Sequence, residues 1–277
     1  AFGSISGSTV ATTATIAQVA YPEMRRINYS GRLATAALAT GGTMGVLLPP
    51  SVTLMVYAIL TEQNITKMFL AAYIPALLAA VGYLIAIAVI VRIHPDQAPQ
   101  AKAATASEMM STAVNVWPIA AIFLVVFGGI YGGVFTATEG AAIGNVLTFA
   151  ITLLRREMTF DKLVASIRTT AQTSGMIFLI FIGADMINAS LALSQLPAQL
   201  ADMVGHLQIS PLVVMAGIMI FYIILGCVMD EMSMILLTVP TLFPVILGMD
   251  FFGLNPSDKA LWFGILILTV CEIGMIF

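Results

Sequence analysis

The chain opens with two apolar segments that are interrupted by small residues and prolines. The first covers residues 1–24 and the second residues 33–51, with a short basic stretch between them. Gly and Ser are frequent in residues 3–8, and residues 41–50 combine three glycines with two prolines. Non-helical backbone at membrane depth is tolerated only where protein buries it or where it lines a water-filled cavity. We therefore expect both segments to be helices that are broken inside a membrane.

The composition agrees with a membrane protein. Of the 277 residues, 60% are hydrophobic and only 9% are charged, and the mean hydropathy is +1.01. A soluble domain carries about 25% charged residues. The fold class predicted is an all-α polytopic membrane protein in the lipid bilayer. The net charge of -3, without a basic tract, argues against nucleic acid as a partner.

No catalytic motif or cofactor motif occurs, and we expect neither an enzyme nor a bound cofactor. Cys227 and Cys271 both lie in apolar stretches and are expected to be packing residues. The chain starts with Ala1 in the middle of a patterned element and stops at Phe277 within an apolar run. It is therefore expected to be part of a longer protein.

Three portions follow from the order of apolar and polar stretches. Residues 1–91 hold a helical hairpin, a broken helix and a membrane span. Residues 92–114, which are rich in Ala and contain Pro and Gln, are expected to be a cytoplasmic linker. Residues 115–277 hold further spans, a basic surface helix at 155–168, a second hairpin at 209–247 and the start of a second broken helix.

The basic residues predict an orientation. If the loop at 25–32 faces the cytoplasm and the sides alternate, that side carries every Lys and Arg except Lys67 and Lys259. This asymmetry fits the positive-inside rule. The first hairpin then opens toward the cytoplasm, and the hairpin at 209–247 opens toward the opposite side.

Two related units that enter from opposite faces form an inverted-topology repeat. Aligning Pro22 with Pro244 brings the polar tips of the two hairpins into register. The alignment pairs Ser4 with Gly226 and Ser8 with Asp230, and residues 42–45 have a counterpart in residues 271–274. Such repeats are typical of transporters with a binding site near the bilayer midplane.

The interruptions supply oxygen ligands and exposed helix ends. Hydroxyls of residues 4–9 and carbonyls of residues 41–50 are expected to form one cation site, and residues 226–230 with the region of Gly274 a second. A hard cation such as sodium prefers oxygen ligands. A substrate carboxylate is expected between the hairpin tips, facing the N-termini of half-helices. The candidate substrate-binding residues are Ser8, Thr9, Thr12 and Asp230, and no residue is expected to be catalytic.

Acidic residues within spans are functional candidates by default, because an ionisable group is costly in a membrane. Asp185 and Asp230 are of this kind, although Asp185 and Asn188 fit an interhelical polar contact equally well. Glu139 and Glu272 lie nearer the ends of predicted spans, where simple solvation is an alternative to a function.

Several of these stretches resemble one family. The segments SGSTVATTATIAQVAYPEM, GGTMGVLLPPS, VFTATEGAAIGN and GCVMDEMSMILLTVPTLFP are similar to the large membrane subunit of tripartite ATP-independent periplasmic (TRAP) transporters. The resemblance covers essentially the whole chain. One turn departs from the usual Thr-Pro-Thr-Glu-Ala pattern and reads Thr-Ala-Thr-Glu-Gly at residues 136–140.

The resemblance implies an inverted-repeat, elevator-type secondary transporter with two re-entrant hairpins in the bacterial inner membrane. Sodium would drive the import of an organic acid of the C4-dicarboxylate, sialic acid or 2-oxo acid type. The implied partners are a periplasmic substrate-binding protein and a small four-helix membrane subunit. Carried over by motif, the first sodium site falls on Ser6, Ser8, Gly42, Gly45, Leu48 and Pro50. The second falls on Gly226, Asp230 and Gly274.

Two alternatives remain at this point. One is a dicarboxylate or citrate sodium symporter of similar hairpin architecture that needs no binding protein. The other is an intramembrane aspartyl protease using Asp185 and Asp230, since two carboxylates that share a site can divide acid and base roles. Neither aspartate has the Gly-x-Gly-Asp setting that such a protease would show.

Overall fold

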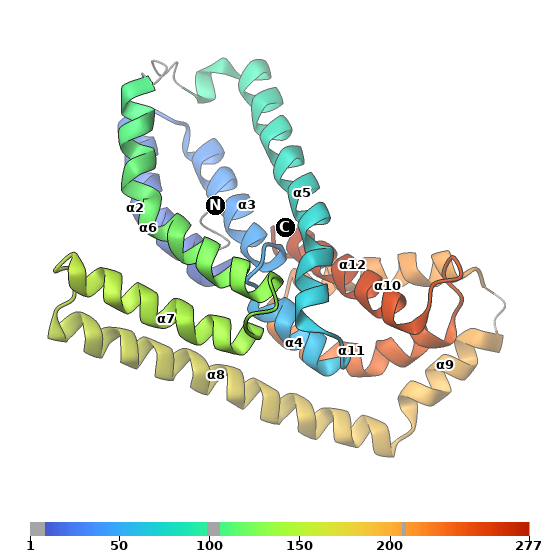
Figure 1. Cartoon of the computed structure of the whole chain (residues 1–277). Coiled ribbons are helices and arrows are strands. Elements are labelled where there is room, and N and C mark those ends of the chain that lie inside the picture. Colours follow the sequence, from blue (N-terminus) through green and yellow to red (C-terminus); the bar gives the residue numbers. More distant parts are fainter. Residues whose placement is uncertain (1–8, 99–105, 207–208, 277) are drawn as a thin grey trace. The chain divides into compact units, whose positions relative to one another are not determined.

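The computed structural model describes residues 9–98, 106–206 and 209–276, which form helices and loops without a strand (Figure 1). The α-helices of these ranges are α2 (Thr9–Arg26), α3 (Gly31–Leu47), α4 (Val52–Leu60), α5 (Ile65–Ile93), α6 (Ala106–Tyr131), α7 (Ala137–Leu154), α8 (Phe160–Leu193), α9 (Leu196–His206), α10 (Pro211–Gly226), α11 (Glu231–Gly248) and α12 (Pro256–Ile276). A short 3-10 helix, η1 (Pro95–Gln97), follows α5.

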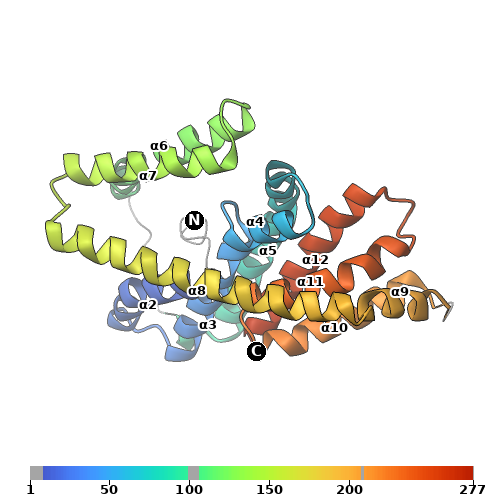
Figure 2. The same ribbon diagram turned by 90° about the horizontal axis from the view of Figure 1, so that it is seen from below.

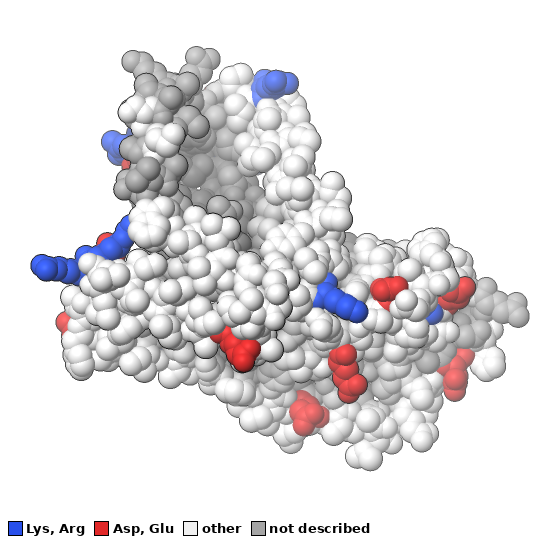
Figure 3. Space-filling model, in the orientation of Figure 1, with Lys and Arg blue, Asp and Glu red and all other residues white. Residues whose placement is uncertain are grey.

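Six of the described helical stretches are long and apolar enough to cross a membrane, which confirms the predicted all-α polytopic fold class. The stretches are Gly31–Leu60, Ile65–Ile93, Ala137–Leu154, Phe160–Leu193, Glu231–Gly248 and Pro256–Ile276. Charged side chains are scattered over a mostly uncharged surface on the face drawn in Figure 3. A surface of this kind suits contact with lipid.

The chain divides into two compact units. The first contains the described residues within 1–99 and 180–277, and the second those within 100–179. In the second unit α6 packs against α7. The turn between them is fixed by a capping box, in which Thr136 and Glu139 bond each other's backbone N–H groups at the start of α7.

Helix α12 is the central element of the first unit. It packs against α3, α4, α5, α10 and α11, and Figures 1 and 2 show it running alongside α10 and α11. The Tyr57 hydroxyl on α4 donates a hydrogen bond to the Ala260 carbonyl on α12, at 2.7 Å. The ring of Tyr57 fits there because residue 264 is glycine, and a Cβ at Gly264 would lie 2.3 Å from a ring carbon. The largest fully buried side chains of this core include Tyr57, Tyr222, Phe251, Phe263, Leu47, Leu54, Met68, Met234 and Ile267.

The break in the first long span is narrower than the sequence predicted. Helix α3 continues through residues 41–45 and ends at Leu47, and only residues 48–51 separate it from α4. The glycines therefore do not interrupt the helix, and the prediction of a break over the whole of residues 41–50 was wrong. The helix ends where two consecutive prolines, Pro49 and Pro50, remove two backbone donors. The side chain of Ser51 then caps α4 by accepting a bond from the Leu54 N–H at 3.1 Å.

Helix α11 contains two prolines without ending at either. Because Pro240 has no N–H, the carbonyl of Leu236 loses its usual partner four residues later. The Asn188 side chain on α8 donates a hydrogen bond to that carbonyl at 3.1 Å. A side chain from a neighbouring helix thus satisfies a carbonyl that the proline leaves free, as in other proline-containing membrane helices.

Two other predicted boundaries were wrong. The surface helix at 155–168 and the span after it are one continuous helix, α8, from Phe160 to Leu193. No proline lies between these residues, so nothing in the backbone forces a break. Helix α6 begins at Ala106, inside the segment 92–114 that was predicted to be a linker.

Candidate functional site

The second predicted hairpin has its tip where the sequence indicated. Helix α10 ends at Gly226 and α11 begins at Glu231, with residues 227–230 between them. Asp230 is the N-cap of α11, and its carboxylate accepts bonds from the Ser233 N–H at 3.1 Å and the Ser233 hydroxyl at 2.5 Å. The side chain is exposed, and its carboxylate satisfies the first turn of α11.

Gly226 and Gly274 were assigned to one site, and the structure brings them into direct contact. A Cβ placed on Gly226 would lie 3.0 Å from the Gly274 Cα. A Cβ on Gly274 would lie 2.7 Å from the Ile223 carbonyl oxygen and 2.9 Å from the Gly226 Cα. The end of α10 therefore meets α12 backbone to backbone, which only glycine permits at both positions.

The structure describes only part of the first predicted cation site. Ser6 and Ser8 lie outside the described residues. Gly42 and Gly45 are buried on α3, Leu48 is half-buried and Pro50 is exposed. Gly42 has a packing role, because a Cβ there would lie within 3.1 Å of the Thr13 Cα on α2.

The two prolines after α3 determine which carbonyls are free. In an α-helix the N–H of residue i bonds the carbonyl of residue i−4. Since Pro49 and Pro50 have no N–H, the carbonyls of Gly45 and Val46 receive no such bond. Gly45, a predicted cation ligand, thus has a carbonyl oxygen free of its intrahelical partner.

The first turn of α2 reaches the first turn of α11. The Thr9 hydroxyl donates a hydrogen bond to Glu231 Oε1 at 2.8 Å, across 222 residues of sequence. Thr9 is 4% exposed and Thr12 only 1%. Two of the four predicted substrate-binding residues, Thr9 and Thr12, are therefore buried, and Thr9 contacts the second hairpin.

Two buried glutamates were missed by the sequence reasoning. Glu231 is 7% exposed and Glu272 is 3% exposed. Solvation, the alternative considered for Glu272, is excluded, because α12 is the central helix and the other helices cover this residue. Glu139 is exposed and caps α7, as its predicted place near a helix end implied.

Asp185 and Asp230 do not form a buried pair. Both side chains are exposed, and Asp230 caps a helix. Asn188 makes the interhelical contact that was foreseen for this part of α8. Within the described ranges, no group of three or more His, Cys, Asp and Glu side chains lies close enough to hold a metal ion.

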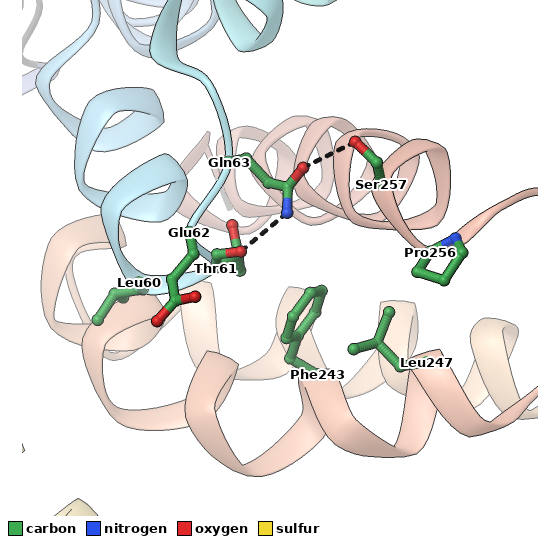
Figure 4. A pocket seen from close by; sticks show the side chains of 8 residues that line it. All are labelled: Leu60, Thr61, Glu62, Gln63, Phe243, Leu247, Pro256 and Ser257. Atoms are coloured by element: carbon green, nitrogen blue, oxygen red, sulfur yellow. Dashed lines mark hydrogen bonds between the residues drawn. The ribbon is translucent and has the colours of Figure 1, made fainter.

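A pocket of about 480 Å³ lies at the other end of α11 (Figure 4). It is lined by Phe243 and Leu247 of α11, by the turn after α4 and by the start of α12. The Ser257 hydroxyl donates a hydrogen bond to the Gln63 side chain at 3.0 Å and joins the two turns. Phe243 follows Glu231 by twelve residues, or about 18 Å along a helix, so this pocket is separate from the hairpin tips.

Comparison with known proteins places this arrangement in a family. The family described as "Tripartite ATP-independent periplasmic transporter, DctM component" matches residues 1–277. A putative TRAP transporter large permease protein of Haemophilus influenzae is 28% identical over 99% of this chain and 66% of its own length. A C4-dicarboxylate TRAP transporter large permease protein of Pseudomonas aeruginosa is also 28% identical, over 62% of its length. A 2,3-diketo-L-gulonate TRAP transporter large permease protein of Escherichia coli is 29% identical, again over 62% of its length.

The chain thus spans somewhat less than two thirds of the length of these relatives. The family match and the six apolar helices together indicate a multi-pass protein of the bacterial inner membrane. The chain belongs to the DctM family, which comprises the large permease components of tripartite ATP-independent periplasmic transporters.

Proposed function

We propose that the protein is the permease of a sodium-coupled transporter that imports an organic acid by an elevator-type movement. A periplasmic binding protein delivers the substrate, and a small four-helix membrane subunit completes the transporter. Sodium ions are coupling ions and no other cofactor takes part. The family membership supports substrate import, and the geometry of the broken helices supports the coupling by a cation.

One observation carries the proposal of cation coupling. The carbonyls of Gly45 and Val46 lack intrahelical donors because Pro49 and Pro50 follow them. Carbonyl oxygens at the end of a half-helix carry partial negative charge. Such ends coordinate sodium in transporters built from discontinuous helices. The hydroxyls expected from Ser6 and Ser8 would complete this first site.

The names of relatives and the hairpin tip support an organic acid as the substrate class. The names of two relatives specify a C4-dicarboxylate and 2,3-diketo-L-gulonate, both of which are organic acids. The N-terminus of α11 carries a positive dipole that favours a carboxylate, and the Asp230 carboxylate already accepts the Ser233 N–H of its first turn. We assign substrate contact to Ser8, Thr9, Thr12 and Asp230 around this tip.

Reconstitution tests the proposal. The complete permease, its small subunit and its binding protein are placed in liposomes, and uptake of radiolabelled organic acids is followed with and without an inward sodium gradient. We expect uptake that needs both the gradient and the binding protein, and that weakens in Ser8→Ala. Ser190→Ala, the same substitution at an exposed position of α8, is the matched control and should transport normally.

Two outcomes would contradict the proposal. Uptake that is indifferent to sodium would exclude sodium as the coupling ion. Uptake by the two membrane subunits without the binding protein would favour the alternative, a binding-protein-independent dicarboxylate or citrate symporter.

A further inference from the structure

The hydrogen bond between Thr9 and Glu231 joins equivalent positions of the two proposed repeats. Their separation of 222 positions is also the offset that aligns Pro22 with Pro244. In a two-fold arrangement, a contact between a residue and its own equivalent lies on the symmetry axis. Thr9 and Glu231 therefore lie at the axis that relates the two proposed repeats.

A second equivalent pair lies in the same region. Aligning Gly45 with Gly274 pairs Thr43 on α3 with Glu272 on α12, and both side chains are buried, at 4% and 3% exposure. The Tyr83 hydroxyl on α5 interacts with the Thr43 side chain and with the Glu272 carboxyl. In both pairs the first repeat supplies a hydroxyl and the second repeat a carboxylate.

The two carboxylates are buried without sufficient partners. Within residues 9–98, 106–206 and 209–276, neither Glu231 Oε2 nor Glu272 Oε1 has a hydrogen-bond partner. The two residues lie in one region, because Gly226, five positions before Glu231, meets the backbone of α12 at Cys271 and Gly274, and their carboxyl groups are near enough to influence each other electrostatically. The salt bridge found in the same ranges joins Arg26 to Glu23, so no basic side chain there balances them. Buried carboxyl groups of this kind either stay protonated or need a compensating partner, such as a bound metal ion, to be ionised.

The surrounding oxygens are suited to a cation. A hydroxyl has one donor and two acceptor lone pairs. The Thr9 hydroxyl donates to Glu231 and the Thr43 hydroxyl donates to the Thr40 carbonyl, at 3.1 Å, so each oxygen uses its proton in these bonds and can still act as an acceptor. Carboxylate and hydroxyl oxygens are the ligands that hard cations prefer.

We propose that Glu231 and Glu272, with the hydroxyls of Thr9 and Thr43, bind a sodium ion between the two repeats. This site is additional to the two sodium sites of the proposed function, and it rests on that function because sodium is taken as the coupling ion. Its residues face away from the second of those sites. Glu272 precedes Gly274 by two positions, about 200° around the helix, and Asp230 is exposed where Glu231 is buried.

Ion counting on the complete transporter tests the site. Binding of radioactive sodium is measured at saturation on the purified transporter, without substrate, for the wild type, Glu231→Gln, Glu272→Gln and the double variant. We expect each single variant to need about tenfold more sodium for half-saturation, equivalent to about 1.4 kcal/mol. The double variant should bind one ion fewer per transporter. Glu157→Gln, the same change at an exposed position, should match the wild type.

Thermal unfolding is measured in a choline salt and again in a sodium salt. The comparison separates a loss of ion binding from a loss of structural stability. Without sodium, the Gln variants should unfold no lower than the wild type, because each replaces a buried carboxyl group by an uncharged amide of nearly the same shape. In sodium, the wild type and Glu157→Gln should show the full rise in unfolding temperature that ion binding produces. The variants at positions 231 and 272 should show a smaller rise. Equal destabilisation of the Gln variants in both salts would overturn the proposal, as would an unchanged number of bound ions in the double variant.

The same samples show which proposal fails. If wild-type uptake is driven by sodium while the glutamate variants bind sodium as the wild type does, only the additional site is wrong. If wild-type uptake ignores sodium, the proposed function itself is wrong, and the additional site is overturned with it.

Discussion

Adding one methyl group at Gly274 tests whether α10 and α12 depend on their backbone contact. In Gly274→Ala the new Cβ would lie 2.7 Å from the Ile223 carbonyl oxygen and 2.9 Å from the Gly226 Cα, where ordinary contacts begin at 3.4 Å. Both neighbours are backbone atoms, so no side chain can turn aside. The helices must separate by roughly 0.7 Å at this point, and a gap of about 0.5–1 Å forfeits a quarter to a half of the dispersion energy.

We expect Gly274→Ala to lower the free energy of unfolding by about 1–3 kcal/mol, as overpacked cores do. The gain from replacing a helical glycine by alanine, about 1 kcal/mol, offsets only part of that loss. Gly217→Ala on α10 is the matched control, because a Cβ there meets nothing within 4 Å and only the helical gain remains.

The assay is thermal unfolding of the complete transporter in lipid nanodiscs, with sodium-driven uptake as a second readout. Gly274→Ala should unfold at a lower temperature and transport poorly, whereas Gly217→Ala should unfold at the wild-type temperature or above it. If the two variants unfold alike, the contact between α10 and α12 is not as close as described and the reasoning is refuted.

Three further substitutions give separate tests. Asn188→Leu leaves the Leu236 carbonyl without a donor and should lower the free energy of unfolding by about 1–3 kcal/mol, and unchanged thermal unfolding would show that the bond is not needed. Tyr57→Phe keeps the ring but removes the bond to Ala260, so a loss of about 1 kcal/mol is expected by the same assay, and a much larger loss would mean that the ring has moved. Pro49→Ala restores an N–H that can bond the Gly45 carbonyl, so the sodium concentration for half-maximal uptake should rise, and an unchanged value would argue against Gly45 as a ligand.

The sequence was informative where the residue types themselves forbid alternatives. Two consecutive prolines at 49 and 50 remove two adjacent N–H donors, unlike the separated prolines of α11, and polar residues at 226–231 interrupt an apolar stretch, so both interruptions were predictable. Glycines are different, because they permit either a break or a close approach. Only the structure shows that Gly42 lies against α2 inside a continuous helix.

The local sequence around Glu231 and Glu272 does not predict that their side chains are buried. Glu272 lies near the end of a predicted span, and its surroundings depend on which helices pack against α12. One signal was available for Glu231. The repeat alignment that pairs Ser8 with Asp230 also pairs the next residues, Thr9 and Glu231, which the structure brings into contact.

The bond from Asn188 to α11 also bears on how these two positions can vary in evolution. Any residue other than proline at position 240 would bring back an N–H for the Leu236 carbonyl, and the amide at position 188 would then have no carbonyl to satisfy. A replacement of Asn188 alone is costly as long as Pro240 remains. The two residues, on different helices and 52 positions apart, should therefore be retained together or lost together among homologous permeases.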